Sequence, residues 1–466
     1  MSPHTLEYVY LITSVCFILA LKGLSSPKTA RYGNLIGAAG AALAVVATFF
    51  AKDVNGQSGY LHHRAVMIVA IIIGTAVGIP AARAVKMTAV PQMVAMFNGV
   101  GGAAAALVSV GEFSRNGDAF STGVALAVVF SAIVGSVSFT GSLVTFAKLQ
   151  ELMTGRPVVF AGQQYAGIGM VVALVGLGIG VIASASTPLL VVLTVLSLVM
   201  GVLFVLPVGG ADVPVVISLL NAFTGLTVAA SGYVLHNTLL IIAGTLVGAS
   251  GTLLTRMMAQ AMGRPLTSTL FGALSGGSTA GATAELTGGG SVRSASAEDI
   301  AILLAYARKV VIVPGYGLAV AQAQHTLREL VDLLESRGVE VSYAIHPVAG
   351  RMPGHMNVLL AEANVPYEQL KEMDEVNPEF PRTDVALVVG ANDVVNPAAR
   401  DMPGSPIYGM PILDVDQAEN VVFLKRSMRP GFAGIDNALL YNPKTTLLFG
   451  DAKDSLTSVV TQVKSA

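Results

Sequence analysis

The 466-residue sequence has little charge and almost no cysteine: 12% of its residues are charged, Cys16 is its single cysteine, and it has no tryptophan. Ordinary soluble proteins carry roughly 25% charged residues, so the deficit argues against a wholly soluble chain. One cysteine excludes an intramolecular disulfide framework, and no metal-binding cluster is apparent, so no metal site is predicted. The net charge of −1 gives no reason to expect a nucleic-acid partner.

Long apolar runs dominate the first part of the chain instead. Hydrophobic residues make up 53% of the sequence, and the mean hydropathy is +0.69. A membrane-spanning helix needs about 20 mostly apolar residues. Nine segments meet this requirement, near residues 5–23, 33–51, 65–84, 91–110, 121–148, 165–184, 187–207, 213–233 and 236–257. The first lacks a basic leader and a clear cleavage site, so we expect a retained span rather than a signal peptide.

The loops between these spans predict the orientation of the chain. Lys and Arg are enriched in cytoplasmic loops. The odd-numbered loops carry Lys22, Lys28, Arg31, Arg83, Lys86, Lys148 and Arg156, and the even-numbered ones carry Lys52, Arg64 and Arg115. We therefore expect the odd-numbered loops, and with them the C-terminal half, to be cytoplasmic.

Polar side chains inside the spans are mainly amides and hydroxyls. Asn98 and Asn221 lie near the middle of their spans, where an amide is costly unless it is used. Ser138 and Ser250 are explained as well by hydrogen bonds between neighbouring helices. Asp212 stands at the mouth of the eighth span. Neither amide titrates, so a proton path through these spans would take its titrating group from another subunit.

Residues 261–296 are rich in Gly, Ser and Thr, a composition typical of a flexible tether. They predict a boundary between a membrane domain at 1–260 and a soluble domain at 297–466. A passive linker and a joint that transmits domain motion are equally compatible with this composition.

Helices and strands alternate in the soluble half. We expect helices at 297–307, 318–337, 354–363 and 451–463, and strands at 310–313, 339–345, 385–389, 421–425 and 446–449. Strands of continuous Val, Ile and Leu between helices indicate a parallel sheet covered on both faces. The predicted fold is thus a polytopic α-helical bundle of about nine spans, followed by an α/β Rossmann-like domain.

The first of these strands runs into Gly315-x-Gly317, the usual start of a dinucleotide-binding unit. These glycines allow a tight turn and let backbone amides approach a pyrophosphate at a helix N-terminus. The third fingerprint position is Val320, so the motif is incomplete. No carboxylate ends the second strand to bind a ribose hydroxyl, which argues against ordinary NAD recognition.

Two cations and a hydroxyl, Lys425-Arg426-Ser427, instead end a later strand and suit the extra phosphate of NADP. A solvated basic pair is the alternative interpretation. Arg351 is another candidate phosphate ligand. Asp393 follows a strand, where ligand loops lie, and is the best candidate for a catalytic carboxylate that senses the redox state or protonation of the cofactor. We find no hydrolytic catalytic set, which fits hydride chemistry performed by a cofactor.

These motifs together resemble the beta subunit of the proton-translocating NAD(P) transhydrogenase, over essentially the whole chain. The matching segments are VPGYGLAVAQAQ at 313–324, IHPVAGRMPGHMN at 345–357, GANDVVNPA at 390–398, KRSM at 425–428, LFGDAK at 448–453, GADVPVV at 210–216 and LLN at 219–221. The resemblance implies a Re/Si-specific enzyme of a bacterial-type inner membrane. In it, this chain would bind NADP(H) in an orientation reversed from that of a standard Rossmann enzyme. An alpha subunit would bind NAD(H), and direct hydride transfer between the two would be coupled to proton translocation. A dimer of alpha–beta units surrounded by membrane lipid would be the assembly.

By this resemblance, the residues that surround NADP(H) are Gly315, Tyr316, Gly317, Val348, Ala349, Gly350, Arg351, Met352, Pro353, Gly390, Ala391, Asn392, Asp393, Val394, Lys425, Arg426, Ser427, Met428, Arg429, Pro430, Gly431, Phe432, Asp451 and Ala452. Those tied to the proton pathway and coupling are Asn98, Asp212, Asn221, Ser250, Gly251 and Arg264. Two positions depart from the family pattern. Asn98 stands where some members have a proton-carrying His, and Phe432 where many have Tyr. A channel or transporter with a nucleotide-sensing cytoplasmic domain is the alternative function.

Overall fold

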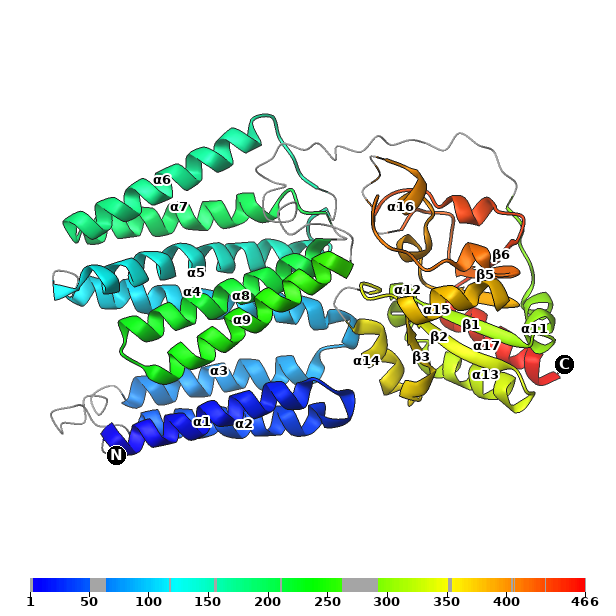
Figure 1. The fold of residues 1–466 in the computed structure, drawn as a ribbon, viewed down its shortest axis with the longest axis horizontal. Helices are drawn as coiled ribbons and strands as arrows, with labels where there is room; N and C mark the ends of the chain where they lie inside the picture. The colour runs from blue at the N-terminus through cyan, green and yellow to red at the C-terminus, as the bar shows by residue number, and fades with distance from the viewer. Residues whose placement is uncertain are drawn as a thin grey trace.

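The computed structural model describes residues 3–50, 64–116, 119–154, 157–209, 212–261, 292–350, 354–403, 405, 407–431 and 433–465. Figure 1 shows a long helical bundle that contains the N-terminus and, beside one end of it, a smaller α/β domain that contains the C-terminus. The predicted fold, an apolar helical bundle followed by an α/β domain with a parallel sheet, is confirmed.

Nine helices in the described part of the chain are long and apolar enough to cross a membrane. They are α1 (Pro3–Leu24), α2 (Pro27–Phe49), α3 (Arg64–Ala84), α4 (Val90–Asn116), α5 (Thr122–Leu149), α6 (Gln163–Ser184), α7 (Thr187–Val205), α8 (Val213–Val234) and α9 (Thr238–Ala261). A short 3-10 turn, η2 (Met87–Ala89), precedes α4. All nine predicted spans are present, with ends that differ by a few residues from those predicted.

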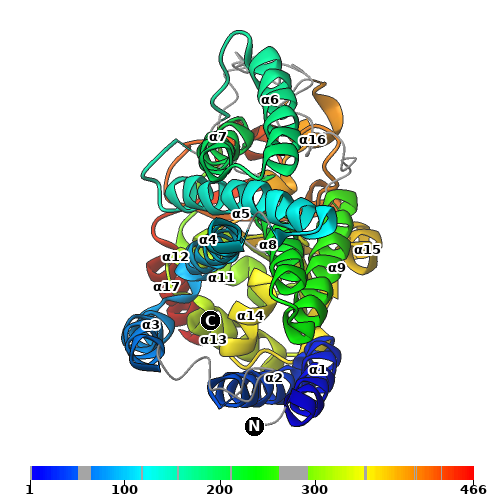
Figure 2. The ribbon, with the colours of Figure 1, turned by 90° about the vertical axis from the view of Figure 1, so that its left-hand side faces the viewer.

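Helices α5 and α8 form the centre of the bundle. About half of the residues in the most apolar stretch of each of these helices are buried. In α3, none of the residues in the corresponding stretch are buried. Seen end-on, α4, α5, α8 and α9 lie together, with α6 and α7 on one side and α1 to α3 on the other (Figure 2). Glycine lets α8 and α9 approach closely: a Cβ on Gly225 would lie 2.5 Å from the Gly248 nitrogen. Such backbone approach is how small residues hold membrane helices together.

The soluble domain is built on one six-stranded parallel sheet. Its strands are β1 (Lys309–Pro314), β2 (Glu340–Ile345), β3 (Leu370–Glu372), β4 (Val385–Val389), β5 (Asn420–Lys425) and β6 (Thr445–Phe449). Their spatial order is β3-β2-β1-β4-β5-β6, the order of a Rossmann fold. In β1, Val310 and Ile312 point into one hydrophobic cluster, and Val311 and Val313 into another. Both faces are therefore buried, as the continuous apolar strands predicted.

Different structures cover the two faces of this sheet. On one face pack α11 (Ala297–Ala305), α12 (Tyr316–Val320), α13 (Gln324–Ser336), α14 (His355–Glu362) and α17 (Ala452–Ser465). On the other lie mainly short turns: α15 (Met373–Val376), η6 (Asn377–Arg382), η7 (Asp393–Val395), η8 (Val415–Gln417) and η9 (Ala438–Tyr441). One more turn, η5 (Tyr367–Gln369), leads into β3, and α16 (Ala398–Asp401) lies at the upper edge of the domain in Figure 1. Strand β3 and these short segments were not predicted.

The helix predicted at 318–337 is wrong in one respect, because the structure divides it into α12 and α13. Gln322 has a φ of 52°, and the Ala323 amide donates to the Leu318 carbonyl. This is the hydrogen bond that ends helices in a Schellman motif. The residue with positive φ in this motif, here Gln322, is usually glycine. The Gln322 side chain supplies a further bond, from Nε2 to the Ala319 carbonyl at 2.8 Å. The sequence lacks the glycine that would have revealed this break.

The start of the soluble domain also differs slightly from the predicted linker. Ser294 pairs with Leu447 in a parallel bridge, and the Ala295 amide donates to the Leu447 carbonyl. Residues 292–296, predicted as the end of the tether, are therefore attached to the edge of the sheet. The rest of the predicted linker, 262–291, lies outside the described residues.

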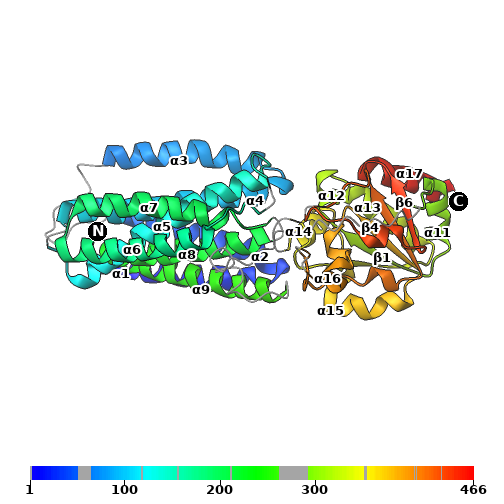
Figure 3. The same ribbon diagram turned by 90° about the horizontal axis from the view of Figure 1, so that it is seen from above.

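The soluble domain meets the bundle at one end only (Figure 3). Helix α12 lies against η2, which follows α3. Val348 packs against a cluster formed by Val215, at the start of α8, and by Met258 and Ala259, near the end of α9. These membrane segments all adjoin odd-numbered loops or the last span, so the odd-numbered loops lie on the side of the soluble domain, as predicted.

The close approach of α8 and α9 gives a test of the bundle. Gly225→Leu would place a branched side chain against the backbone of α9, which cannot move away without separating the helices, and overpacking costs about 1–3 kcal/mol or more. We expect less of this variant to elute as a monodisperse peak after detergent extraction. Gly176→Leu on α6 is the matched control, because a Cβ at that position would meet no neighbouring atom within 4 Å. Equal yields of the two variants would contradict the packing described.

Candidate functional site

A pocket of about 440 Å³ opens at the carboxyl ends of β1 and β4. These two strands are neighbours in the sheet, but the chain proceeds to opposite sides after them, so they form the topological switch point. Ligands of open α/β sheets bind in this crevice. Its lining residues are Leu149, Glu151, Pro214, Gly315, Tyr316, Gly317, Val348, Ala349, Gly350, Gly390, Ala391, Asn392, Asp393, Val394, Ile407, Met410, Arg426, Pro430 and Gly431.

The glycines of the first turn are needed for packing between loops. A Cβ on Gly315 would lie 2.4 Å from Ala391 Cα, and one on Gly317 would lie 2.7 Å from Gly390 Cα. The Gly315 amide donates to the Val389 carbonyl and the Gly317 amide to the Gly390 carbonyl, each at 2.9 Å. These two amides are therefore already hydrogen-bonded within the domain. The glycines bring the β1 and β4 turns together.

Asp393 holds the turn that follows β5 in place. Its Oδ2 accepts a hydrogen bond from the Ala433 amide at 2.8 Å, and its Oδ1 accepts one from Asn392 Nδ2 at 3.0 Å. A Cβ on Gly431 would lie 2.4 Å from Asp393 Oδ1, so this turn packs directly on the carboxylate. Asp393 thus joins the pocket to the 425–433 turn.

The two cations predicted as phosphate ligands have different positions. Arg426 is exposed and lines the pocket. Lys425 does not line it: its Nζ donates to the Arg429 carbonyl at 2.9 Å and approaches Asn392 Oδ1 at 3.4 Å. Burial lowers the pKa of Lys425, against the opposing effect of the Asp393 and Asp436 carboxylates. Lys425 therefore shapes the turn, and Arg426 is the one of these two cations that lines the pocket.

His346 fixes the loop at the end of β2. It is 1% exposed. Its Nδ1 accepts the Val348 amide hydrogen at 3.2 Å, and its Nε2 lies 2.8 Å from the Pro411 carbonyl oxygen. An amide only donates and a carbonyl only accepts, so both bonds require the neutral ring with its proton on Nε2. Burial accordingly lowers the pKa of His346 to about 4.

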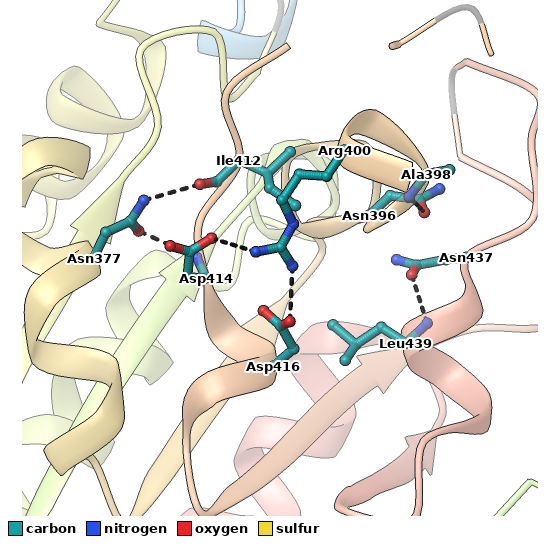
Figure 4. A network of polar contacts seen from close by, with 9 residues as sticks. All are labelled: Asn377, Asn396, Ala398, Arg400, Ile412, Asp414, Asp416, Asn437 and Leu439. Atoms are coloured by element: carbon teal, nitrogen blue, oxygen red, sulfur yellow. Dashed lines mark hydrogen bonds and ion pairs between the residues drawn. The ribbon is translucent and has the colours of Figure 1, made fainter. Parts of the chain in front are cut away.

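The residues between 396 and 412 cover one side of the pocket with Ile407 and Met410. A polar network anchors the base of this segment (Figure 4). Asn377 Nδ2 donates to the Ile412 carbonyl at 3.0 Å, and Arg400 binds Asp414 and Asp416 at 2.9 and 2.7 Å. Burial raises the pKa of Asp414, although Arg400 opposes this effect. The apolar wall is therefore held by ion pairs outside the pocket.

The bundle supplies the opposite wall through Leu149, Glu151 and Pro214. Lys148 keeps these residues together. Its buried Nζ donates to the carbonyls of Val205, Leu206 and Val208 at 3.1, 2.6 and 2.7 Å, which ties the end of α5 to the turn before α8. Sequence reasoning missed this wall, since nothing local in the sequence shows which loop ends reach the soluble domain.

The predicted cofactor residues divide into three groups. Those in the turns after β1, β2 and β4, together with Arg426, Pro430 and Gly431, come together around the pocket. Lys425, Ser427, Met428, Arg429, Asp451 and Ala452 do not line it. Arg351, Met352, Pro353 and Phe432 lie outside the described residues. Ile407 and Met410 were missed, because they lie far from any recognisable motif.

The pocket has the volume and the mixed polar and apolar lining of a small-molecule site. The volume falls within the 300–1,000 Å³ typical of small-molecule sites. Arg426 offers a planar cation suited to a phosphate, and Ile407, Met410 and Val348 offer apolar surface. The carboxylates of Asp393 and Glu151 add negative charge to the positive charge of Arg426, so the pocket contains both signs.

The predicted membrane positions lie in two groups. Asn98 is buried, and its Nδ2 donates to Ser142 at 2.9 Å and to Ser138 at 3.3 Å. Ser138 also bonds Thr224 at 2.7 Å, so this network joins α4, α5 and α8. Asn98 Oδ1 is buried and accepts no hydrogen bond from the described residues.

The second group lies along α8 and α9. A Cβ on Gly251 would lie 3.0 Å from Ala222, which marks a close approach of the two helices. Ser250 and Asn221 are half-buried, and Ser250 donates to the Val247 carbonyl of its own helix at 3.2 Å. Asp212 is the N-cap of α8. Arg264 lies outside the described residues.

Comparison with known proteins finds similarity over nearly the whole chain. A family model described as the NAD(P) transhydrogenase beta subunit matches residues 6–462. A Rhodospirillum rubrum protein named NAD(P) transhydrogenase subunit beta is 47% identical over 459 residues, covering 97% of each chain. A protein of the same name from a specified strain of that species matches equally well.

The buried state of His346 predicts a pH-dependent stability. The unfolded chain binds a proton near pH 6.5, but the folded chain does so only near pH 4. Between these values the unfolded state holds more protons, so stability falls as the pH decreases. The loss approaches about 3 kcal/mol by pH 4, at roughly 1.4 kcal/mol for each pH unit. Calorimetry of the detergent-solubilised chain should show the soluble domain melting at lower temperature at pH 5 than at pH 7.

His346→Asn should flatten this dependence, because the amide does not titrate. His325→Asn is the matched control, since His325 is exposed on α13, and it should keep the wild-type dependence. A His346→Asn protein that retains the full slope would show that another group is responsible.

Proposed function

The chain belongs to the NAD(P) transhydrogenase beta subunit family, and we propose that it is the NADP(H)-binding subunit of a proton-translocating transhydrogenase. The family name implies an alpha subunit as its partner. The observation that carries the proposal is the pocket at the switch point of the sheet, which has Arg426 on one wall and the ends of membrane helices on another. Residues from a fold that is typical of nucleotide binding and residues from the membrane bundle thus line the same pocket.

NADP(H), rather than NAD(H), is the proposed ligand of this chain. The residue that follows β2 is the neutral, buried His346, whereas an NAD site uses an acid there to bind the ribose 2′-hydroxyl. Arg426 supplies a cation for a 2′-phosphate instead. The NAD(H) site would then belong to the alpha subunit.

When bound, the cofactor supplies the hydride chemistry itself. The residues of this chain bind it, orient it and exclude water. Ile407 and Met410 cover the pocket with apolar surface. Asp393 joins the pocket to the 425–433 turn, so it is the proposed carboxylate that responds to the state of the cofactor.

The proposed proton path follows the polar seam between α4, α5 and α8. Asn98, Ser138 and Thr224 are hydrogen-bonded there, and Asn98 retains a buried acceptor. Buried acceptors of this kind are usually satisfied by water. Because Asn98 does not titrate, the proposal takes the titrating group from the alpha subunit.

The charge of the loops supports a cytoplasmic soluble domain. The odd-numbered loops, which carry the excess of Lys and Arg, lie on its side of the bundle. The proposal also includes a dimer of alpha–beta units in a bacterial-type inner membrane.

The complete function has a direct test. The chain, co-expressed with its alpha subunit and reconstituted in sealed vesicles, should reduce an NAD analogue at the expense of NADPH. It should also change the internal pH, detected by an entrapped dye. Nucleotide binding without hydride transfer would contradict the proposal. Hydride transfer that leaves the internal pH constant would contradict the proposed proton translocation and leave the proposed hydride transfer standing.

Arg426 provides a test of nucleotide selectivity. Arg426→Ala removes a charge-assisted hydrogen bond worth about 1.5–3 kcal/mol, so NADPH binding should weaken by roughly 10- to 100-fold. Binding of NADH, which the proposal assigns to the alpha subunit, should change little. Arg429→Ala, an exposed arginine of the same turn outside the pocket lining, is the control. Titration calorimetry on the holoenzyme measures both, and equal losses for the two nucleotides would contradict the assignment.

A further inference from the structure

Val348 connects three parts of the molecule. This half-buried side chain packs against the hydrophobic cluster on one face of the sheet. It also packs against the cluster formed by Ala398, Ala399, Ile407, Met410 and Ile412. In addition it packs against the cluster formed by Val215, Met258 and Ala259 at the ends of α8 and α9. We call these last three residues the socket.

The socket is well defined on the membrane side. Val215 and Ala259 are each 1% exposed, and Met258 is 5% exposed. None of the three lines the pocket, whereas Val348 does. The side chain of Val348 therefore has one surface toward the cofactor pocket and another toward the bundle.

The backbone of Val348 is fixed by His346. The Val348 amide donates to His346 Nδ1 at 3.2 Å, and the same ring donates from Nε2 to the Pro411 carbonyl at 2.8 Å. Pro411 lies next to Met410, a pocket residue. A displacement of the wall at Met410 would consequently reach Val348 through one buried ring.

The bundle at the socket is equally able to transmit a displacement. Ser218, one turn after Val215 on α8, donates to the Gly251 carbonyl at 3.2 Å and accepts a bond from Thr255 at 3.0 Å. Both partners lie on α9. Helices α8 and α9 therefore meet directly above the socket, and α8 contains Thr224 of the polar seam.

We propose that Val348 is the positioning residue that couples the cofactor pocket to the membrane spans, by seating in the socket of Val215, Met258 and Ala259. This inference rests on the proposed function and names the contact through which it works. Suppose that the soluble domain has two states that differ in their contact with the socket. A ligand that binds one state more tightly then shifts the equilibrium of the bundle by the same free energy, which is enough to couple the two sites.

The test uses the holoenzyme in sealed vesicles during hydride transfer from NADPH to an NAD analogue. A coupled enzyme builds a proton gradient that restrains its own turnover, so a proton ionophore stimulates the rate. Val348→Ala and Met258→Ala should each reduce this stimulation to less than half of the wild-type factor. The double variant should be no worse than either single one, because all three remove the same contact.

Two controls separate the contact from general damage. Met258→Leu keeps the volume of the side chain and should restore the stimulation. Val358→Ala, on the exposed face of α14, should behave as wild type. If Met258→Ala does not accumulate in membranes, Val348→Ala and Val358→Ala carry the comparison, because both lie outside the spans.

Three outcomes would overturn the inference: wild-type stimulation in both alanine variants, effects that multiply in the double variant, or loss of NADPH binding in Val348→Ala while Met258→Ala remains fully coupled. A wild-type holoenzyme without hydride transfer would overturn the proposed function itself. The wild-type measurement therefore distinguishes the two failures before any variant is compared.

Discussion

The close approach of the turns after β1 and β4 is the constraint on which the rest of the site depends. Gly315 and Gly317 lie against Gly390 and Ala391 with no room for side chains, and their amides bond the neighbouring strand end. This contact forms part of the pocket, so the side chains that line it must come from other segments. Arg426, Ile407 and the membrane residues Glu151 and Pro214 provide them. The pocket is thus shared between the two halves of the chain.

The bundle combines close packing with few charges. Glycines draw α8 and α9 together, and buried hydroxyls join α4, α5 and α8. Ser109, Ser131 and Ser231 form a second such junction, each 2.9 Å from the other two. Lys148 is a buried cation of these helices, and three carbonyls bind its ammonium group. Hydrogen-bonded polar groups inside a low-dielectric bundle are costly to displace, which favours a small number of defined arrangements over continuous movement.

Much of this architecture could be predicted from local sequence patterns. Apolar length revealed all nine spans, and continuous Val and Ile revealed five of the six strands; β3 has only three residues and no such run. The helix break at Gln322 was not predicted, because the residue with positive φ there is not a glycine. The turns that carry motifs formed the pocket, but Lys425 turned inward to the Arg429 carbonyl. Glu151, Pro214 and Met410 required tertiary structure, because they meet the site only through the docking of distant segments.

The central claim is that Val348 couples the pocket to the membrane helices through its contact with the socket of Val215, Met258 and Ala259. Oxidative cross-linking tests it directly in membranes, with Val348→Cys and Met258→Cys introduced after Cys16, the single native cysteine, is replaced by Ser. A disulfide forms only when the two Cα atoms come within about 7 Å of each other, so its formation reports close approach of the two segments. We predict rapid formation of the bond, at a rate that differs between NADP+ and NADPH. A pair that cross-links no faster than Val358→Cys with Met258→Cys would contradict the account.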